Sequence, residues 1–255
     1  MLDSDLVTIG TAALGGGVAV KLLEFVFQEI KEWRVGRTDH SRSVDRNLEP
    51  LLRSADELVG KLRSLAEQDF LPIRQADVTN LGDPGCSSVV YLFVQFWSEI
   101  EIIRFRGLSS QVAKSQRGRW VQAFLRCLES RRLRLIDRIS QRAVGEAALT
   151  DGRTMNYVEF MKSHDSDPYV KRWLAPLLDA LKAVDTVEGR QRILQYAVVV
   201  HALIDVLDRE RLVTRNRPAI PNKLNKRSKR DLTYRVFGVY LKFVRDQAKY
   251  IGPLN

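Results

Sequence analysis

The sequence has few of the residues that build cross-links or metal sites. Its 255 residues include only two cysteines and three histidines. Cys86 and Cys127 lie far apart and match no metal-ligand spacing, which favours two buried thiols in a reducing compartment over a disulfide framework or a zinc site. The chain holds eight prolines and 15 glycines, with no low-complexity tract and no regular repeat. A disordered chain is therefore not the expected class, and no period suggests a solenoid.

No motif of a known enzyme class occurs in the chain. The P-loop, GxGxxG, GxSxG and HExxH patterns are all absent. Residues 163–167 read SHDSD, but a catalytic triad is assembled from distant segments rather than from neighbours. His201 and Asp205 are four residues apart, and one histidine with one carboxylate does not make a metal site. We therefore predict a protein that is not an enzyme and that holds no metal and no cofactor.

Positive charge is concentrated at the carboxyl end. Residues 211–255 contain 12 of the 41 Lys and Arg residues but only two of the 31 Asp and Glu residues, so the first 210 residues are neutral and the net charge of +10 belongs to this basic tail. Such an imbalance predicts an anionic partner for the tail.

Apolar residues recur at three- and four-residue spacing through most of the chain, which predicts an all-α, multi-helix bundle. In the first amphipathic segment they form one stripe that should face the core. Pro176 is expected to kink its helix. The stripe consists of Leu51, Leu52, Ala55, Leu58, Val59, Leu62 and Leu65. The predicted helices are Leu48–Phe70, Ser87–Arg106, one or two helices within Gln111–Leu149, Met155–Met161, Asp167–Val184 and Glu188–Arg211.

The opening segment Leu6–Phe27 raises the question of a membrane span. Its first 15 residues carry no charge, which is about 22 Å of helix and too short for a bilayer core of roughly 30 Å. All 22 residues would be long enough, with Lys21 and Glu24 near one end, where a lysine can reach the interface. We predict a single-pass anchor in the cell inner membrane, and the alternative is a buried core or oligomerisation helix.

Charges beside this segment predict its orientation. Asp3 and Asp5 precede it, whereas Lys31, Arg34 and Arg37 follow it. The positive-inside rule then places the rest of the chain in the cytoplasm. A cleaved signal peptide is disfavoured, because no Lys or Arg precedes the apolar run.

The basic tail is expected to consist of a linker, Asn216–Arg230, followed by one amphipathic helix. That helix has an apolar stripe that includes Phe237, Leu241, Val244 and Ile251. Three interpretations stay open: the tail binds an anionic membrane surface, it binds nucleic acid, or its helix packs against the body with a solvated charged face. The cations assigned to anion binding are Lys223, Lys226, Arg227, Lys229, Arg230, Arg235, Lys242, Arg245 and Lys249.

Charged residues within apolar helices form the second candidate site. Such residues are costly to bury unless they are paired. They predict either an ionic network that joins helices or a polar pocket for a small anionic ligand, in which arginines donate hydrogen bonds. The candidates are Glu101, Arg104, Gln141, Arg142, Glu146, Asp205 and Asp208.

Three stretches carry a resemblance to a known family: LLRSADELVGKLRSLAEQDF, QRAVGE and LIDVLD. With the E-x-x-R helix, they resemble uncharacterised bacterial helical proteins that have an N-terminal membrane segment. The resemblance covers roughly residues 48–208 and implies significance for the candidates above and for Gly145. The sequence departs from the family at Glu99 and in its basic tail.

These observations lead to a predicted organisation and three hypotheses. Residues 1–36 form the anchor, residues 37–211 a cytoplasmic bundle, and residues 212–255 the basic linker and amphipathic helix. The first hypothesis is a membrane-anchored, non-enzymatic protein that binds an unknown protein partner or acts as a sensor at the inner leaflet. The alternatives are a soluble nucleic-acid-binding protein and a membrane-acting effector of a defence or toxicity system. The oligomeric state stays open.

Overall fold

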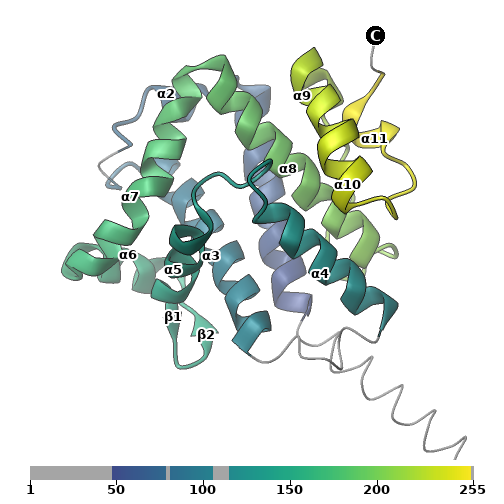
Figure 1. The fold of residues 1–255 in the computed structure, drawn as a ribbon. Coiled ribbons are helices and arrows are strands. Elements are labelled where there is room, and N and C mark those ends of the chain that lie inside the picture. Colours follow the sequence, from purple (N-terminus) through teal and green to yellow (C-terminus); the bar gives the residue numbers. More distant parts are fainter. Residues whose placement is uncertain (1–47, 79–80, 106–114, 254–255) are drawn as a thin grey trace, which may run out of the picture. The chain divides into compact units, whose positions relative to one another are not determined.

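The computed structural model describes residues 48–78, 81–105 and 115–253, all within one folded unit, Arg46–Asn255 (Figure 1). The first described helix covers residues 48–67, and every member of the predicted apolar stripe on it is buried. Asp69 and Phe70, both with positive φ, turn the chain into the short α2, Leu71–Arg74. The predicted anchor lies outside the described residues.

Helix α3, Pro84–Phe105, confirms the second predicted helix and lies in the core. Of the helices described here, it is the one that is long and apolar enough to cross a membrane, but 78% of its apolar window is buried inside the protein. A core helix of a globular protein has the same composition, so this is weak support for a span. The indole N–H of its Trp97 donates to the hydroxyl of Tyr196 at 2.8 Å, which gives both buried polar groups a partner.

The described part of the predicted helical segment 111–149, which begins at residue 115, forms two helices and the start of a hairpin. Helix α4 covers Gln116–Leu128 and helix α5 covers Arg138–Ala147. Strands β1, Leu149–Thr150, and β2, Arg153–Thr154, pair antiparallel. Asp151 and Gly152, which join them, both have positive φ, as a two-residue hairpin turn requires. The helical interpretation was therefore wrong at its end, and the Asp-Gly pair was the signal for the turn.

Three further helices complete the body. Helix α6, Tyr157–Ser166, begins with a capping box formed by Asn156 and Glu159. Helix α7, Pro168–Lys182, contains Pro176, and the 3-10 turn η2, Ala183–Asp185, leads into helix α8, Val187–Leu207. Twelve residues of α8 are buried, and α3 has a similar share with 13 buried residues, so both are core helices as predicted.

The basic tail differs from its predicted form. After the 3-10 turn η3, Pro221–Lys223, a helical run begins at Lys226, inside the predicted linker, because Asn225 caps it by accepting from the amide of Ser228. The run consists of α9, Lys226–Arg230, the π-helical η4, Asp231–Phe237, and α10, Gly238–Tyr240. It ends at Tyr240, and α11, Ala248–Ile251, follows separately. The prediction of one long last helix was wrong.

A side chain takes part in the backbone hydrogen bonding of the π-helical turn. The hydroxyl of Thr233 donates to the carbonyl of Lys229 at 2.8 Å, so a side chain competes for an acceptor of the helix backbone. One face of the tail is apolar and buried, and it consists of Leu232, Val236, Phe237, Leu241, Val244, Tyr250 and Ile251. They pack against the body, where α10 contacts α4 and both α9 and α11 contact α8 (Figure 1).

Helices α3 and α5 approach each other closely at Gly145, and this contact can be tested. A Cβ atom at Gly145 would lie 2.8 Å from the backbone oxygen of Trp97. Alanine favours a helix over glycine by about 1 kcal/mol, yet we expect Gly145→Ala to lower the free energy of unfolding by about 1 to 3 kcal/mol, because the backbones must separate. Urea denaturation measures the change. Glu146→Ala, at an exposed position of the same helix, is the control and should be nearly neutral.

Candidate functional site

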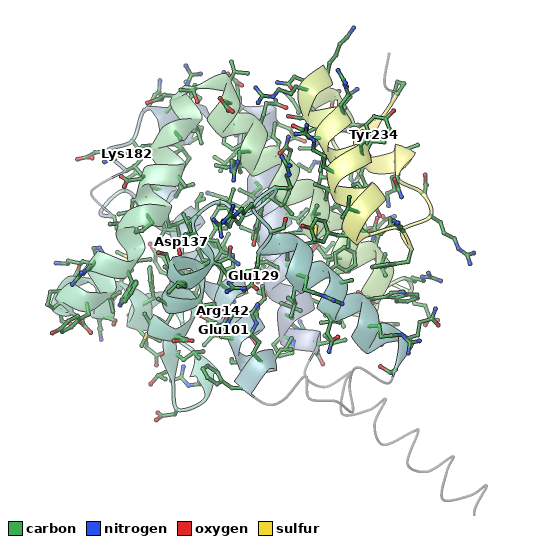
Figure 2. All side chains as sticks on the ribbon, viewed as in Figure 1. Glu101, Glu129, Asp137, Arg142, Lys182 and Tyr234 are labelled. Atoms are coloured by element: carbon green, nitrogen blue, oxygen red, sulfur yellow. The ribbon has the colours of Figure 1, made fainter. Side chains whose placement is uncertain are left out.

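Three of the seven predicted polar residues come together in one ionic network. Arg104 donates to Glu101 at 2.6 Å and to Glu129 at 2.5 Å, and Arg142 donates to both oxygens of Glu129 at 3.1 and 3.3 Å. These side chains join α3, α5 and the end of α4 (Figure 2). Sequence reasoning missed Glu129, which accepts from both arginines, because it lies in a polar segment, just beyond the last apolar turn of its helix.

The pKa values of the two carboxylates in this network are shifted in opposite directions. Burial raises the pKa of Glu101 to about 7, more than Arg104 and Arg142 lower it. Burial also acts to raise the pKa of Glu129, but its hydrogen bonds and charge contacts with Arg142 and Arg104 outweigh burial and hold it below its usual value. Glu101 is 4% exposed. The network therefore holds one carboxylate that is stable as an anion and one that is not.

The other candidates of α5 lie outside this network. Gln141 is buried and, within the described part of the chain, its side-chain oxygen has no hydrogen-bond partner. Glu146 is exposed and acts on Glu101 and Arg142 only through its charge. Gly145 packs against α3, and its carbonyl accepts from the hydroxyl of Ser98 at 2.8 Å. None of these residues adds a donor to a shared pocket.

Asp205 belongs to a second cluster near the carboxyl end of α8. Its carboxylate accepts from Arg211, from Lys249 and, at 2.6 Å, from the hydroxyl of Tyr250. The Nε2 atom of His201 lies 3.7 Å from Oδ1 of Asp205. Burial acts to raise the pKa of Asp205, but these donors and nearby charges hold it below its usual value. Burial lowers the pKa of His201, so this core histidine stays neutral and the carboxylate stays charged.

Asp208 has a structural role at the end of α8. Its oxygens accept from the amides of residues 212–214 and from the hydroxyl of Thr214. These bonds set the turn that follows the helix. Five of the seven predicted residues therefore divide between two ionic clusters and a cap, Gln141 and Glu146 belong to neither cluster, and the set does not converge on one pocket.

The predicted anion-binding cations differ in how free they are. Seven of them are exposed: Lys249 and a group of six, Lys226, Arg227, Arg230, Arg235, Lys242 and Arg245. Arg235 pairs with Asp231 at 3.1 Å. Lys249 is held by Asp205, and the amine of Lys229 donates to the carbonyl of Pro253 at 3.2 Å. Lys223 is partly buried. The charge of Lys249 is therefore compensated inside the fold, whereas the other six exposed cations face solvent.

A basic groove lies beside the helical run Lys226–Tyr240 of the tail, and the sequence did not predict it. We use that name for a hollow of about 360 Å³ lined by five arginines, Arg131, Arg132, Arg192, Arg227 and Arg235, together with two carboxylates, Glu188 and Asp231, and neighbouring polar residues. The arginines come from the turn after α4, from α8 and from the tail. A smaller hollow, of about 220 Å³, is lined by Arg53, Asp56, Glu57, Val213, Arg215 and Arg217. Neither hollow is lined by Glu101, Glu129 or Asp205.

Within residues 48–78, 81–105 and 115–253, no group of three or more His, Cys, Asp and Glu side chains is arranged to hold a metal ion. Comparison of this chain with family models, with curated proteins and with solved structures finds no match. The functional conclusions below therefore depend on the residues themselves.

The raised pKa of Glu101 predicts a measurable effect of pH on stability. The folded protein keeps this proton up to a pH of about 7, whereas an unfolded chain releases it near 4.5. The contribution of Glu101 to the free energy of unfolding therefore decreases as the pH rises from about 4.5 to about 7, and it is constant above that range. Glu101→Gln should remove this contribution, so that wild type and variant diverge by up to about 3 kcal/mol between the two ends of this range. Urea denaturation across that range measures it, and parallel stability curves would contradict the assignment.

The Asp205 cluster predicts how the end of the chain is attached. Asp205→Asn removes the charge that holds Arg211 and Lys249, and we expect a loss of about 3 kcal/mol in the free energy of unfolding. Hydrogen exchange should become faster at the amides of α11 and of residues 211–214. Asp179→Asn, which alters a distant exposed pair on α7, is the matched control. Unchanged exchange in α11 would show that the cluster does not hold it.

Proposed function

We propose that this chain is a membrane-anchored, non-enzymatic helical protein whose folded domain binds the anionic surface of the inner leaflet through its basic tail. The observation that carries the proposal is that the apolar and the charged side chains of the tail lie on different faces. The apolar side chains on its inner face are buried against the body, while six of the predicted anion-binding cations are exposed and are not held by Asp205. The tail is therefore a rigid basic surface.

The geometry favours electrostatic binding over insertion. Phe237, Leu241, Val244 and Ile251, which an inserting helix would bury in lipid, are already buried in protein. Tyr234 and Val239 are the large apolar side chains that remain exposed on the helical run Lys226–Tyr240. A cation near an anionic leaflet contributes about 1 kcal/mol, so six together are enough to hold a domain whose opening segment already lies in the same membrane.

The opening segment supports the choice of a membrane over nucleic acid. The sequence of Leu6–Phe27 matches a marginal span with a positively charged cytoplasmic flank. Tail and flank would then face the same leaflet. Nucleic acid presents phosphates to the same cations, so it is the outcome that the experiment must separate from the proposal.

Energy transfer from a labelled tail to the membrane surface tests the proposal on the full chain. Tyr234→Cys supplies an exposed thiol on the tail, whereas Cys86 and Cys127 are buried. The labelled protein is reconstituted into vesicles that carry a headgroup acceptor dye. We expect more transfer in vesicles containing phosphatidylglycerol than in pure phosphatidylcholine, and we expect salt to remove the difference because it screens exposed charges.

Matched charge variants make the test specific. Lys226→Gln, Arg230→Gln, Lys242→Gln and Arg245→Gln together should remove the effect of phosphatidylglycerol. The control neutralises four exposed cations of α6 and α7, namely Lys162, Lys171, Arg172 and Lys182. Of these, Lys182 is seen on the other side of the view from Tyr234 (Figure 2). It should leave the transfer unchanged.

Three results would contradict the proposal. Equal transfer in neutral and anionic vesicles would show that the tail does not bind the surface. Recovery of the wild-type protein in the soluble fraction of cells would show that the opening segment is not an anchor. Salt-sensitive retention on DNA or RNA, without any preference for anionic vesicles, would favour the nucleic-acid alternative.

A further inference from the structure

We propose that the basic groove is a discrete binding site for a phosphate-bearing ligand that carries two or more negative charges. This inference deepens the proposed function, since Arg227 and Arg235 also belong to the tail surface. It differs from that function in requiring one defined place, built by three segments, where a phosphate group is held. Either a lipid headgroup or a soluble molecule can supply this phosphate.

The groove has a fixed frame. The side-chain amide of Gln191 on α8 donates to the carbonyl of Lys223 at 2.8 Å, and its oxygen accepts from the amide of Asn225 at 2.9 Å. Asn225 in turn caps α9. This clamp joins the start of the tail helix to α8. Arg227 and Arg192 are therefore carried by elements whose separation is set by hydrogen bonds.

The third wall is joined to the same helix. Arg192 donates from Nε and Nη2 to the carbonyl of Arg134, at 3.2 and 2.7 Å. This contact positions the turn that carries Arg131 and Arg132. The contacts of Gln191 and Arg192, one residue apart, thus connect α8 with the two other segments of the groove.

The charges of the groove are unbalanced. Asp231 is paired with Arg235, which leaves Glu188 as the other carboxylate of the lining. Among the residues that the structure describes, Arg131, Arg132 and Arg227 form no ion pair. Three guanidinium groups thus face one hollow without a partner, and a ligand with a single negative charge would not balance them.

Phosphate suits this arrangement better than other anions. A phosphomonoester carries a charge of about −1.5 to −2 near neutral pH. Its oxygens match the paired N–H groups of arginine, which bind it by two parallel hydrogen bonds. The hollow of about 360 Å³ falls at the lower end of the usual range for small-ligand sites. It can therefore hold a phosphorylated headgroup or a compact diphosphate.

Pyrophosphate is the probe that tests the site. Its binding to the full chain in detergent micelles is measured by calorimetry. We expect Arg131→Gln with Arg132→Gln to weaken binding by about tenfold or more, since both lost guanidinium groups would donate charged hydrogen bonds to the ligand. The control is Lys226→Gln with Arg230→Gln, which removes the same amount of charge from α9, beside the groove, at two residues that do not line it. It should change binding by about twofold at most, as a surface charge does.

A second arm separates the two sources of phosphate. The protein is reconstituted into phosphatidylcholine vesicles with or without phosphatidic acid, whose headgroup is a phosphomonoester. Competition between phosphatidic acid and pyrophosphate would support a lipid headgroup as the ligand. Pyrophosphate binding that phosphatidic acid does not alter would support a soluble one.

Two results would overturn the inference. One is the absence of pyrophosphate binding, and the other is equal weakening by the groove pair and the control pair. In both cases energy transfer to phosphatidylglycerol vesicles can still succeed, because it depends on the exposed cations of the whole tail. Conversely, pyrophosphate binding with no preference for anionic vesicles would retain the groove and contradict the proposed function. The unfolding midpoint of each variant confirms that it is folded.

Discussion

The enclosure of helix α8 is the constraint on which the rest of the structure depends. Its central residues are apolar on nearly all sides, and twelve of its side chains are buried. Such a helix is stable in water only when other helices surround it. Tyr196 meets Trp97 on one side, Gln191 and Asp205 bind the tail on another, and Arg192 holds the turn after α4. Residues of α8 therefore organise both the ionic cluster at its end and the basic groove near its beginning.

The buried charges of this protein act mainly as joints between helices. A buried ion pair is expensive to desolvate, and its measurable benefit is often specificity of packing rather than stability. Glu129 joins three elements through two arginines, and Asp205 joins α8 to the last helix. Neither cluster lines a described hollow. The polar-pocket interpretation of these residues is therefore weaker than the structural one, although Glu101 adds a dependence on pH to the network.

Burial of the tail's apolar face changes what its charge can do. A free amphipathic helix would bind a membrane by inserting its apolar stripe and attracting headgroups together. In this protein the apolar stripe is buried against the body, so the cations are presented on a rigid scaffold. Rigid presentation lowers the entropy that binding would otherwise cost. It also lets Arg227 and Arg235 share a hollow with arginines that lie far away in the sequence.

The sequence by itself determined the helical class, the buried stripe of residues 48–67, the core positions of α3 and α8, and the location of the basic charge. These follow from periodicity and composition, which local sequence expresses directly. It also indicated Glu101 with Arg104, because a spacing of three residues places both on one helix face. The hairpin at Asp151 and Gly152 carried a local signal as well, which the helical interpretation overrode.

Tertiary structure alone decided which distant groups meet. Glu129 lies 25 residues from Arg104, Tyr250 lies 45 residues from Asp205, and Lys223, whose carbonyl Gln191 binds, lies 32 residues from it. No periodic pattern encodes such pairings, because they depend on how whole helices pack. The same is true of the break after Tyr240 and of the basic groove, whose arginines belong to three segments. Sequence placed the charge in the tail, and packing determined which of those charges are paired and which remain exposed.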